Sequence, residues 1–168
     1  MSRAFVKESD DDLVAGDLPE RPLPVHVNYV TPKGLELLHA RVRELTERHE
    51  QYKRDADDDD SAARQKLRET DRDLRYFRTQ LDRAVVVDTG QQPRDQVHFG
   101  ALATIEDEEG GRQEFSIVGD DEADVTAGKI SWASPLARAM IGAKVGDTVV
   151  WRRPAGEAEV YIVGIRYP

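Results

Sequence analysis

The sequence predicts an α+β fold in which an antiparallel coiled-coil helical hairpin precedes a small antiparallel sheet domain with one short helix. Residues 32–54 and 61–84 each carry apolar or semi-apolar side chains at alternating spacings of three and four, the period of a coiled-coil seam. An aspartate-rich break separates these two stretches. From residue 97 onwards the pattern changes to short apolar runs divided by glycine-containing turns, which favours antiparallel strands.

The first helix begins at a clear start signal. Thr31 can cap it, and Pro32 in the first helical position loses no backbone hydrogen bond. The roughly 23 residues from Pro32 to Arg54 would span about 35 Å at the rise of an α-helix. The expected seam residues, which include His49 in a structural role, are Leu38, Val42, Leu45, His49 and Tyr52.

The second helix is expected over residues 61–84 and carries a matching seam. The break between the helices, Asp55-Ala-Asp-Asp-Asp-Asp60, is poor helix material and repels itself, so it forms a loop. Two such helices joined by a short polar loop should pack antiparallel, seam against seam, with the aspartates at the tip. The seam residues of the second helix are Leu67, Thr70, Leu74, Phe77, Leu81 and Ala84.

Three regions follow along the chain. Residues 1–30 form a tail that is either extended or disordered, because prolines at 19, 22 and 24 disfavour a helix. Residues 31–87 form the hairpin, with its acidic tip at 55–60, and residues 88–168 form the sheet domain. Strands are expected over 97–107, 112–119, 147–153 and 157–166, a short helix after Ser134-Pro135 over 136–141, and a solvated acidic loop over 120–124.

The net charge of −9 is unevenly distributed. The two expected helices hold thirteen basic and eight acidic residues, whereas the tip holds five aspartates and residues 89–168 hold thirteen acidic and eight basic residues. The chain is therefore a basic rod between an acidic tip and an acidic base. This argues against simple wrapping of nucleic acid by a uniformly basic surface.

Basic residues crowd the second helix away from its seam. Pairs one turn apart, such as Arg64 with Arg68 and Arg68 with Arg72, each cost about 0.2–0.5 kcal/mol. A partner bound to this face is therefore favoured over a merely solvated face. The basic residues concerned are Arg64, Lys66, Arg68, Arg72, Arg75 and Arg78.

The aspartates of the tip suggest a divalent cation, because Mg²⁺ prefers carboxylate oxygens and takes one or two from a protein. Asp57 to Asp60 could hold an ion weakly, could complete the coordination of an ion held elsewhere, or could form a hydrophilic loop and nothing more. Composition alone favours the last of these. An EF-hand is excluded, because the run lacks the central glycine and the final glutamate of that loop.

Other chemistry is excluded or lacks a motif. The chain has no cysteine, which excludes disulfides, thiolate zinc sites and cysteine nucleophiles. No apolar stretch is long enough to span a membrane, and the charges of Lys7, Glu8 and Asp10 fall where the apolar part of a secretion signal would lie. No phosphate-loop, dinucleotide-binding, serine-hydrolase or zinc-protease motif occurs. We therefore expect a cytoplasmic protein without an active site of its own.

Short motifs spread over nearly the whole chain occur together in one known family. In the hairpin they are Tyr29-Val-Thr-Pro-Lys-Gly34 with Leu35 and Leu38, Lys66-Leu-Arg-Glu-Thr-Asp-Arg-Asp-Leu-Arg-Tyr76 and Val86-Val-Asp88. In the sheet domain they are Val97-His-Phe-Gly100, Phe115-Ser-Ile-Val-Gly119, Ser134-Pro-Leu-Ala-Arg-Ala139, Lys144-Val-Gly-Asp147 and Pro154-Ala-Gly-Glu157. The chain thereby resembles the bacterial Gre transcript-cleavage factors (GreA/GreB-like) and their homologues. Its opening, Ser2-Arg-Ala-Phe-Val-Lys-Glu8, resembles a GreB-like subgroup with an N-terminal extension.

The resemblance implies a regulator of bacterial RNA polymerase that is not itself an enzyme. It implies an FKBP-like sheet domain without isomerase activity, docked at the rim of the polymerase secondary channel, and a coiled coil that enters the channel. The protein would act as a monomer with no cofactor of its own, would share the catalytic Mg²⁺ of the polymerase, and would touch the RNA 3′ end only indirectly. The implied metal-facing residues are Asp55, Asp57, Asp58, Asp59 and Asp60, and the implied polymerase-binding residues are Ser134, Pro135, Leu136, Arg138, Lys144, Gly146 and Asp147.

The tip departs from the pattern of the cleavage factors, which carry an Asp followed three residues later by Glu-Asn, then Ala and an aromatic residue. Here it lacks Glu-Asn and the aromatic residue and resembles the aspartate-rich tips of inhibitory homologues. The hairpin is also about a dozen residues shorter than in typical Gre factors, or roughly 9 Å less reach. We therefore expect inhibition or modulation of transcription. Stimulation of transcript cleavage, and a role as an interaction module for a protein other than polymerase, remain alternatives.

Overall fold

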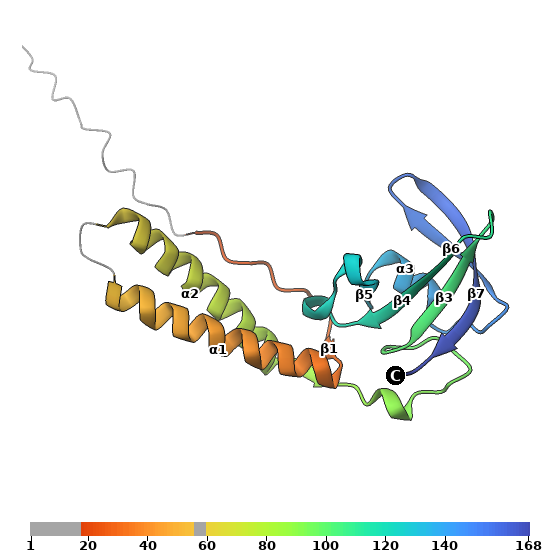
Figure 1. Cartoon of the computed structure of the whole chain (residues 1–168), viewed down its shortest axis with the longest axis horizontal. Helices are drawn as coiled ribbons and strands as arrows, with labels where there is room; N and C mark the ends of the chain where they lie inside the picture. The colour runs from red at the N-terminus through yellow and green to blue at the C-terminus, as the bar shows by residue number, and fades with distance from the viewer. Residues whose placement is uncertain (1–17, 56–59) are drawn as a thin grey trace, which may run out of the picture.

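A helical hairpin projects from a curled sheet in the computed structural model, which describes residues 18–55 and 60–168 (Figure 1). Helices α1 (Pro32–Asp55) and α2 (Ser61–Asp82) form the hairpin. At its base, strands β1 (Asn28–Val30) and β2 (Ala84–Val86) pair in parallel, with Asn28 opposite Ala84. The expected order of hairpin and sheet domain is confirmed.

The start of α1 is the one that the sequence predicts. The backbone N–H of Gly34 donates to Oγ1 of Thr31 at 2.8 Å, and the N–H of Leu35 donates to the Thr31 carbonyl at 2.9 Å. At the other end of the hairpin, α2 stops at Asp82 and not at residue 84. It stops early because residues 84–86 are extended and pair with β1, which is a tertiary contact that the helical pattern does not contain.

The predicted seam holds the two helices together. Leu38 and Leu45 of α1 and Thr70 and Leu74 of α2 are all buried. His49 has the structural role expected of it, because its Nε2 lies 2.9 Å from Oδ1 of Asp71 on the facing helix. Ridges of this kind packed along two antiparallel helices make a stiff rod.

A five-stranded sheet in the order β5-β4-β3-β7-β6 forms the second part of the protein. Its strands are β3 (Leu102–Asp107), β4 (Arg112–Val118), β5 (Lys129–Ser131), β6 (Thr148–Arg153) and β7 (Gly156–Arg166). The pairs β3–β4, β3–β7 and β6–β7 are antiparallel, as expected. The edge strand β5 lies where no strand was expected and runs parallel to β4.

The short helix α3 (Pro135–Met140) covers the core of this domain. It contributes three buried side chains, Leu136, Ala137 and Met140, against strand residues such as Ile117 and Ile162. The first strand of the sheet domain, β3, begins at Leu102 and not at residue 97, because Gly100 adopts a left-handed turn with φ of +85°. The remaining helical turns are η1 (Thr89–Gln91), η2 (Asp120–Glu122) and η3 (Val125–Ala127).

The expected solvated loop over 120–124 is confirmed at Asp124, which is exposed, and is wrong for the acidic residues at 120–122. They form η2, which lies between the base of the hairpin and the sheet (Figure 1). Asp121 accepts hydrogen bonds from the Tyr76 hydroxyl at 3.1 Å and from Nε2 of Gln80 at 2.9 Å, both on α2. Glu122 accepts from Oγ1 of Thr31 at 2.5 Å, and its side chain is only 6% exposed.

Close approach of other groups to two glycines completes this junction. A Cβ atom at Gly34 would lie 2.8 Å from Oε2 of Glu122, and one at Gly119 would lie 2.5 Å from the Tyr29 carbonyl oxygen. The Tyr29 ring also meets the ring of Trp132 edge-on, with 5.1 Å between the centroids. The hairpin base is therefore seated on the sheet domain by carboxylates, glycines and aromatic rings together.

The seam makes a direct prediction for stability. Leu45 is 3% exposed in the seam, whereas Leu37 on the same helix is 42% exposed. We expect Leu45→Ala to lower the free energy of unfolding by about 2–5 kcal/mol, because the substitution removes buried methyl groups and leaves a cavity. Leu37→Ala should change it by about 0.5 kcal/mol or less. Urea unfolding followed by circular dichroism measures both, and equal losses would show that the seam is not the packed face.

The junction predicts a pH dependence. Burial, together with the neighbouring Asp121 carboxylate, raises the pKa of Tyr76 to about 12. Because the pKa of an unfolded tyrosine is about 10, the stabilisation should be complete below about pH 10 and should be lost as the pH rises towards 12. The unfolding free energy should therefore fall more steeply over this range in the native protein than in Tyr76→Phe.

A control for this measurement is Tyr161→Phe, since Tyr161 is 38% exposed and lies on β7, away from the junction. Its slope should match that of the native protein. If Tyr76→Phe also gave the native slope, the hydroxyl of Tyr76 would not be held against Asp121 in solution.

Candidate functional site

Asp55 and Asp60, the described residues of the expected tip, lie at the end of the hairpin farthest from the sheet (Figure 1). Asp55 is the last residue of α1, and its Oδ2 accepts a hydrogen bond from Nε2 of Gln51 at 2.6 Å. Asp60 is the N-cap of α2, and its Oδ1 accepts from the backbone N–H groups of Ala62 at 2.9 Å and Ala63 at 3.1 Å. The other predicted metal-facing residues, Asp57, Asp58 and Asp59, lie outside the described residues.

The described tip residues have the chemistry of ligands but do not form a complete metal site. Carboxylate oxygens are the donors that Mg²⁺ prefers. Asp60 uses Oδ1 to cap the helix, and its Oδ2 takes no part in the cap. Over residues 18–55 and 60–168, no three acidic or histidine side chains gather closely enough to hold an ion. Asp55 and Asp60 could therefore add ligands to an ion held elsewhere.

The predicted docking residues around α3 lie together in part. Oγ of Ser134 accepts from the N–H of Ala137 at 3.3 Å and so begins the helix. Leu136 is 4% exposed and packs in the core, so its side chain can only support the surface from below. Pro135 and Arg138 border an open cavity of about 440 Å³, which Ala133, Ala139, Val150 and Arg152 complete.

The other predicted docking residues form a separate turn after α3. Gly146 has a φ of +96°, which the tight turn requires, and the backbone N–H of Lys144 donates to Oδ2 of Asp147 at 2.8 Å. Nζ of Lys144 lies 3.1 Å from Asp95, and this hydrogen bond and charge hold the pKa of the Asp95 carboxyl below its ordinary value. None of these residues lines the cavity beside α3.

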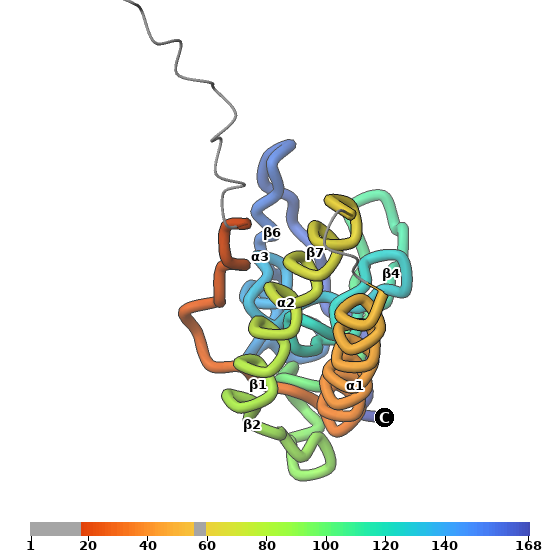
Figure 2. The backbone as a smooth tube through the Cα atoms, turned by 90° about the vertical axis from the view of Figure 1, so that its left-hand side faces the viewer, coloured from red at the N-terminus to blue at the C-terminus, as the bar shows by residue number. Residues whose placement is uncertain are grey.

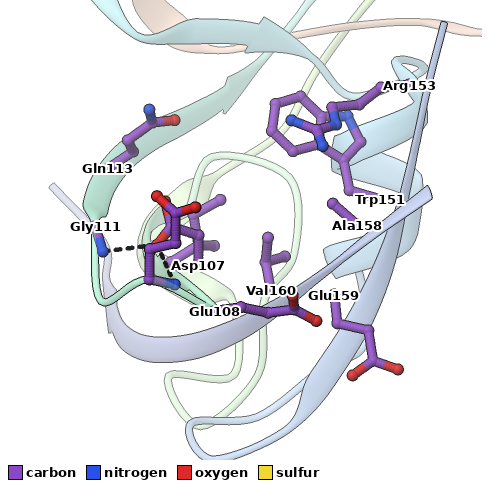
Figure 3. A pocket seen from close by; sticks show the side chains of 11 residues that line it. Asp107, Glu108, Gly111, Gln113, Trp151, Arg153, Ala158, Glu159 and Val160 are labelled. Carbon is purple, nitrogen blue, oxygen red and sulfur yellow. Dashed lines mark hydrogen bonds between the residues drawn. The ribbon is translucent and has the colours of Figure 1, made fainter. Parts of the chain in front are cut away.

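A further cavity, of about 290 Å³, was not predicted from the sequence (Figure 3). Trp151 and Arg153 of β6 face it, with the Arg153 guanidinium 5.2 Å from the centre of the Trp151 ring. Asp107 lies at its edge and accepts from the N–H groups of Glu109 and Gly111 in the β3–β4 turn. The alternation of side chains along β6 and β7 would have placed Trp151 and Val160 on this face, once the strand pairing was known.

Two of the arginines of α2 have partners within the chain. Nη2 of Arg75 lies 2.6 Å from Glu20, and Nη2 of Arg72 lies 3.5 Å from Asp73. These contacts relieve part of the repulsion among the basic residues of α2, which was the reason to expect a bound partner on this face. That a partner binds there stays a prediction.

These features define a class of protein: a small sheet domain that carries a helical rod of about 36 Å, the length of a 24-residue helix, with Asp55 and Asp60 at its far end. Residues 92–167 match the family model for the C-terminal part of the transcription elongation factors GreA/GreB. The transcription elongation factor GreB of Neisseria meningitidis serogroup B is 37% identical over 153 residues, which cover 83% of this chain and 94% of that protein. GreB of Pseudomonas aeruginosa is likewise 37% identical, with 83% and 90% covered.

Among solved structures, GreA factor homolog 1 (Gfh1) of Thermus thermophilus matches at 27% identity, over 84% of this chain and 99% of that one, with a TM-score of 0.38. The level and extent of identity to the GreB proteins settle the family. The chain belongs to the GreA/GreB family of transcription elongation factors, which are not enzymes. Within the described residues, no helix has the length and apolar character needed to cross a membrane.

The role of Asp60 as a helix cap can be separated experimentally from the effect of its negative charge. Asp60→Ala should lower the free energy of unfolding by about 1 kcal/mol, because two N–H groups at the start of α2 lose their acceptor. Asp60→Ser removes the carboxylate but keeps a capping oxygen, so it should lose much less. Thermal unfolding of the two variants measures the difference, and equal stabilities would show that Asp60 does not cap α2.

Proposed function

We propose that this chain binds bacterial RNA polymerase, inserts its hairpin into the secondary channel and presents the tip aspartates to the catalytic Mg²⁺, so that nucleotide addition is inhibited or modulated. The observation that carries the proposal is the position of the acidic run: Asp55 ends one helix and Asp60 caps the next. These two carboxylates therefore sit at the far end of a rod, in a chain of the GreA/GreB family.

The proposed inhibition follows from the ligand preferences of Mg²⁺. The ion takes oxygen ligands in a near-octahedral shell, usually with waters and substrate phosphates in several positions. A tip carboxylate that occupied one of those positions would compete with the phosphates of the incoming nucleotide. Asp60 supports this reading, because the cap uses only one of its two carboxylate oxygens.

The proposed docking surface is the region beside α3, with the turn at Lys144, Gly146 and Asp147 as a second contact. Pro135 and Arg138 are exposed there and border the open cavity. Val150 on β6 is 43% exposed at the same cavity and gives it an apolar wall. A surface that combines exposed apolar groups with arginine has the composition of a protein interface.

A second candidate function is stimulation of transcript cleavage. The relatives named GreB, at 37% identity over most of this chain, favour it. In that case the same tip carboxylates would help to hold a second metal ion and a water at the polymerase site, by the logic of two-metal catalysis.

The two functions differ in an assay on stalled elongation complexes. We expect the native protein to slow nucleotide addition and to leave the RNA intact. The variant Asp57→Asn/Asp58→Asn/Asp59→Asn/Asp60→Asn removes the tip charge but keeps an N-cap, since asparagine also caps helices. It should lose most of the inhibition, by about tenfold or more, which corresponds to about 1.4 kcal/mol in binding.

A matched control replaces four exposed acidic residues on the two helices: Glu36→Gln/Glu47→Gln/Glu50→Gln/Asp82→Asn. This variant should inhibit like the native protein. Inhibition that survives the tip substitutions would contradict the proposed mechanism. Shortened RNA with a new 3′ end would replace it with cleavage stimulation, and failure of the native protein to bind polymerase would remove both functions.

A further inference from the structure

Residues 18–27 run along the outside of α2 towards the sheet domain (Figures 1 and 2). We call this segment the strap. Oε1 of Glu20 accepts from Nε and Nη2 of Arg75 at 3.1 and 2.6 Å. The guanidinium of Arg21 lies 4.0 Å from the centre of the Tyr76 ring, and its Nη1 lies 3.4 Å from Asp73. The first half of the strap is thus attached to α2 by charges and by a cation–π contact.

The second half of the strap is attached through its backbone. Arg83 caps the end of α2, and its Nη2 donates to the carbonyl oxygens of Pro24 at 3.0 Å and His26 at 2.9 Å. Prolines at 19, 22 and 24 restrict the backbone to extended conformations, so little entropy is lost when these carbonyls are held in place.

His26 carries the strap across to the sheet domain. Its Nε2 lies 2.6 Å from Oδ2 of Asp120, and its ring meets the Trp132 ring edge-on at 5.1 Å. Both partners belong to the sheet domain, and Asp120 is further held by a hydrogen bond from the Ser131 hydroxyl. The side chains of His26 and Asp120 are only 25% and 21% exposed, so water competes weakly for this contact.

We propose that the strap is a clamp that fixes the direction in which the hairpin projects from the sheet domain. The contacts of η2 seat the hairpin on the sheet domain through Thr31, Tyr76 and Gln80, all near its base. The strap adds a second attachment on α2, through Glu20, Arg21 and Arg83, and joins it to the sheet through His26. The effect on tip placement rests on the proposed function, whereas the clamp itself is a property of the free protein.

The absence of native cysteines allows this to be measured directly. Cysteines placed at Glu47 on α1 and Thr148 on β6, both exposed, can carry two spin labels on the full chain. Pulsed electron–electron double resonance then gives the distribution of distances between the spin label on α1 and the spin label on β6. We expect one narrow distribution in the otherwise native protein, and a broader distribution with additional distances in Arg21→Ala/His26→Ala.

The matched control is His39→Ala/Arg43→Ala, the same two residue types on the exposed side of α1. It should keep the narrow distribution. A second strap variant, Glu20→Lys, sets two positive charges against each other at Arg75 and should broaden the distribution without removing an aromatic contact. Far-UV circular dichroism shows that each variant is folded.

A distribution that stays narrow in both folded strap variants would overturn the clamp, and would leave the proposed function untouched. A broadened distribution in a protein that does not bind polymerase would support the clamp and contradict the proposed function. The two failures are therefore distinguishable.

Discussion

The three consecutive carboxylates of η2 are the constraint on which the rest of the molecule depends. These carboxylates lie between the hairpin and the sheet domain, and together they accept hydrogen bonds from both sides. They belong to Asp120, Asp121 and Glu122. A partly buried carboxylate that loses its donors costs considerable free energy, so the hairpin cannot leave the sheet domain without hydrating all three groups at once. Because the rod extends about 36 Å from this point, a tilt of about 10° at its base would move its far end by about 6 Å.

At the other end of the rod, one residue serves structure and function together. Asp60 fastens the start of α2 through two backbone N–H groups while one carboxylate oxygen stays outside the cap. The same helix start that gives the rod its length thus holds a negative charge at its extreme point. The helix dipole of α2 also favours a negative charge there, which eases the self-repulsion of an acidic run.

Features encoded by neighbouring residues were predictable from the sequence. The Thr31 cap, the apolar repeat within each hairpin helix and the Ser134 cap of α3 each depend on residues within a few turns of one another. Features that depend on distant contacts were not. The three carboxylates of η2 have the composition of a solvated loop, and only their partners in the strap, just before α1 and on α2 make them a junction. Strand β5 and the β1–β2 pair are likewise too short to show a recognisable strand pattern in the sequence.

The candidate site shows the same division. Asp60 was expected at the tip, but its capping role emerges only from the geometry, and Leu136 was expected on the docking surface although it belongs to the core. Two glycines in the sequence indicate the junction, but the prediction from the sequence did not include them. Gly34 sits in the first turn of a long helix, where the Glu122 carboxylate comes too close for a side chain, and Gly119 follows a strand, where the Tyr29 backbone does. Such glycines mark places where two bodies meet.

The measurement that bears most directly on the whole arrangement is crosslinking from the tip. A photoreactive residue at position 62, which is exposed at the start of α2, can be compared with one at position 148 on the sheet, both in complexes with RNA polymerase. The structure and the proposed function together predict that position 62 crosslinks to polymerase residues around the catalytic Mg²⁺ and that position 148 does not. Crosslinks from position 62 confined to the outer surface of polymerase would contradict a rod that delivers its acidic tip to the catalytic centre.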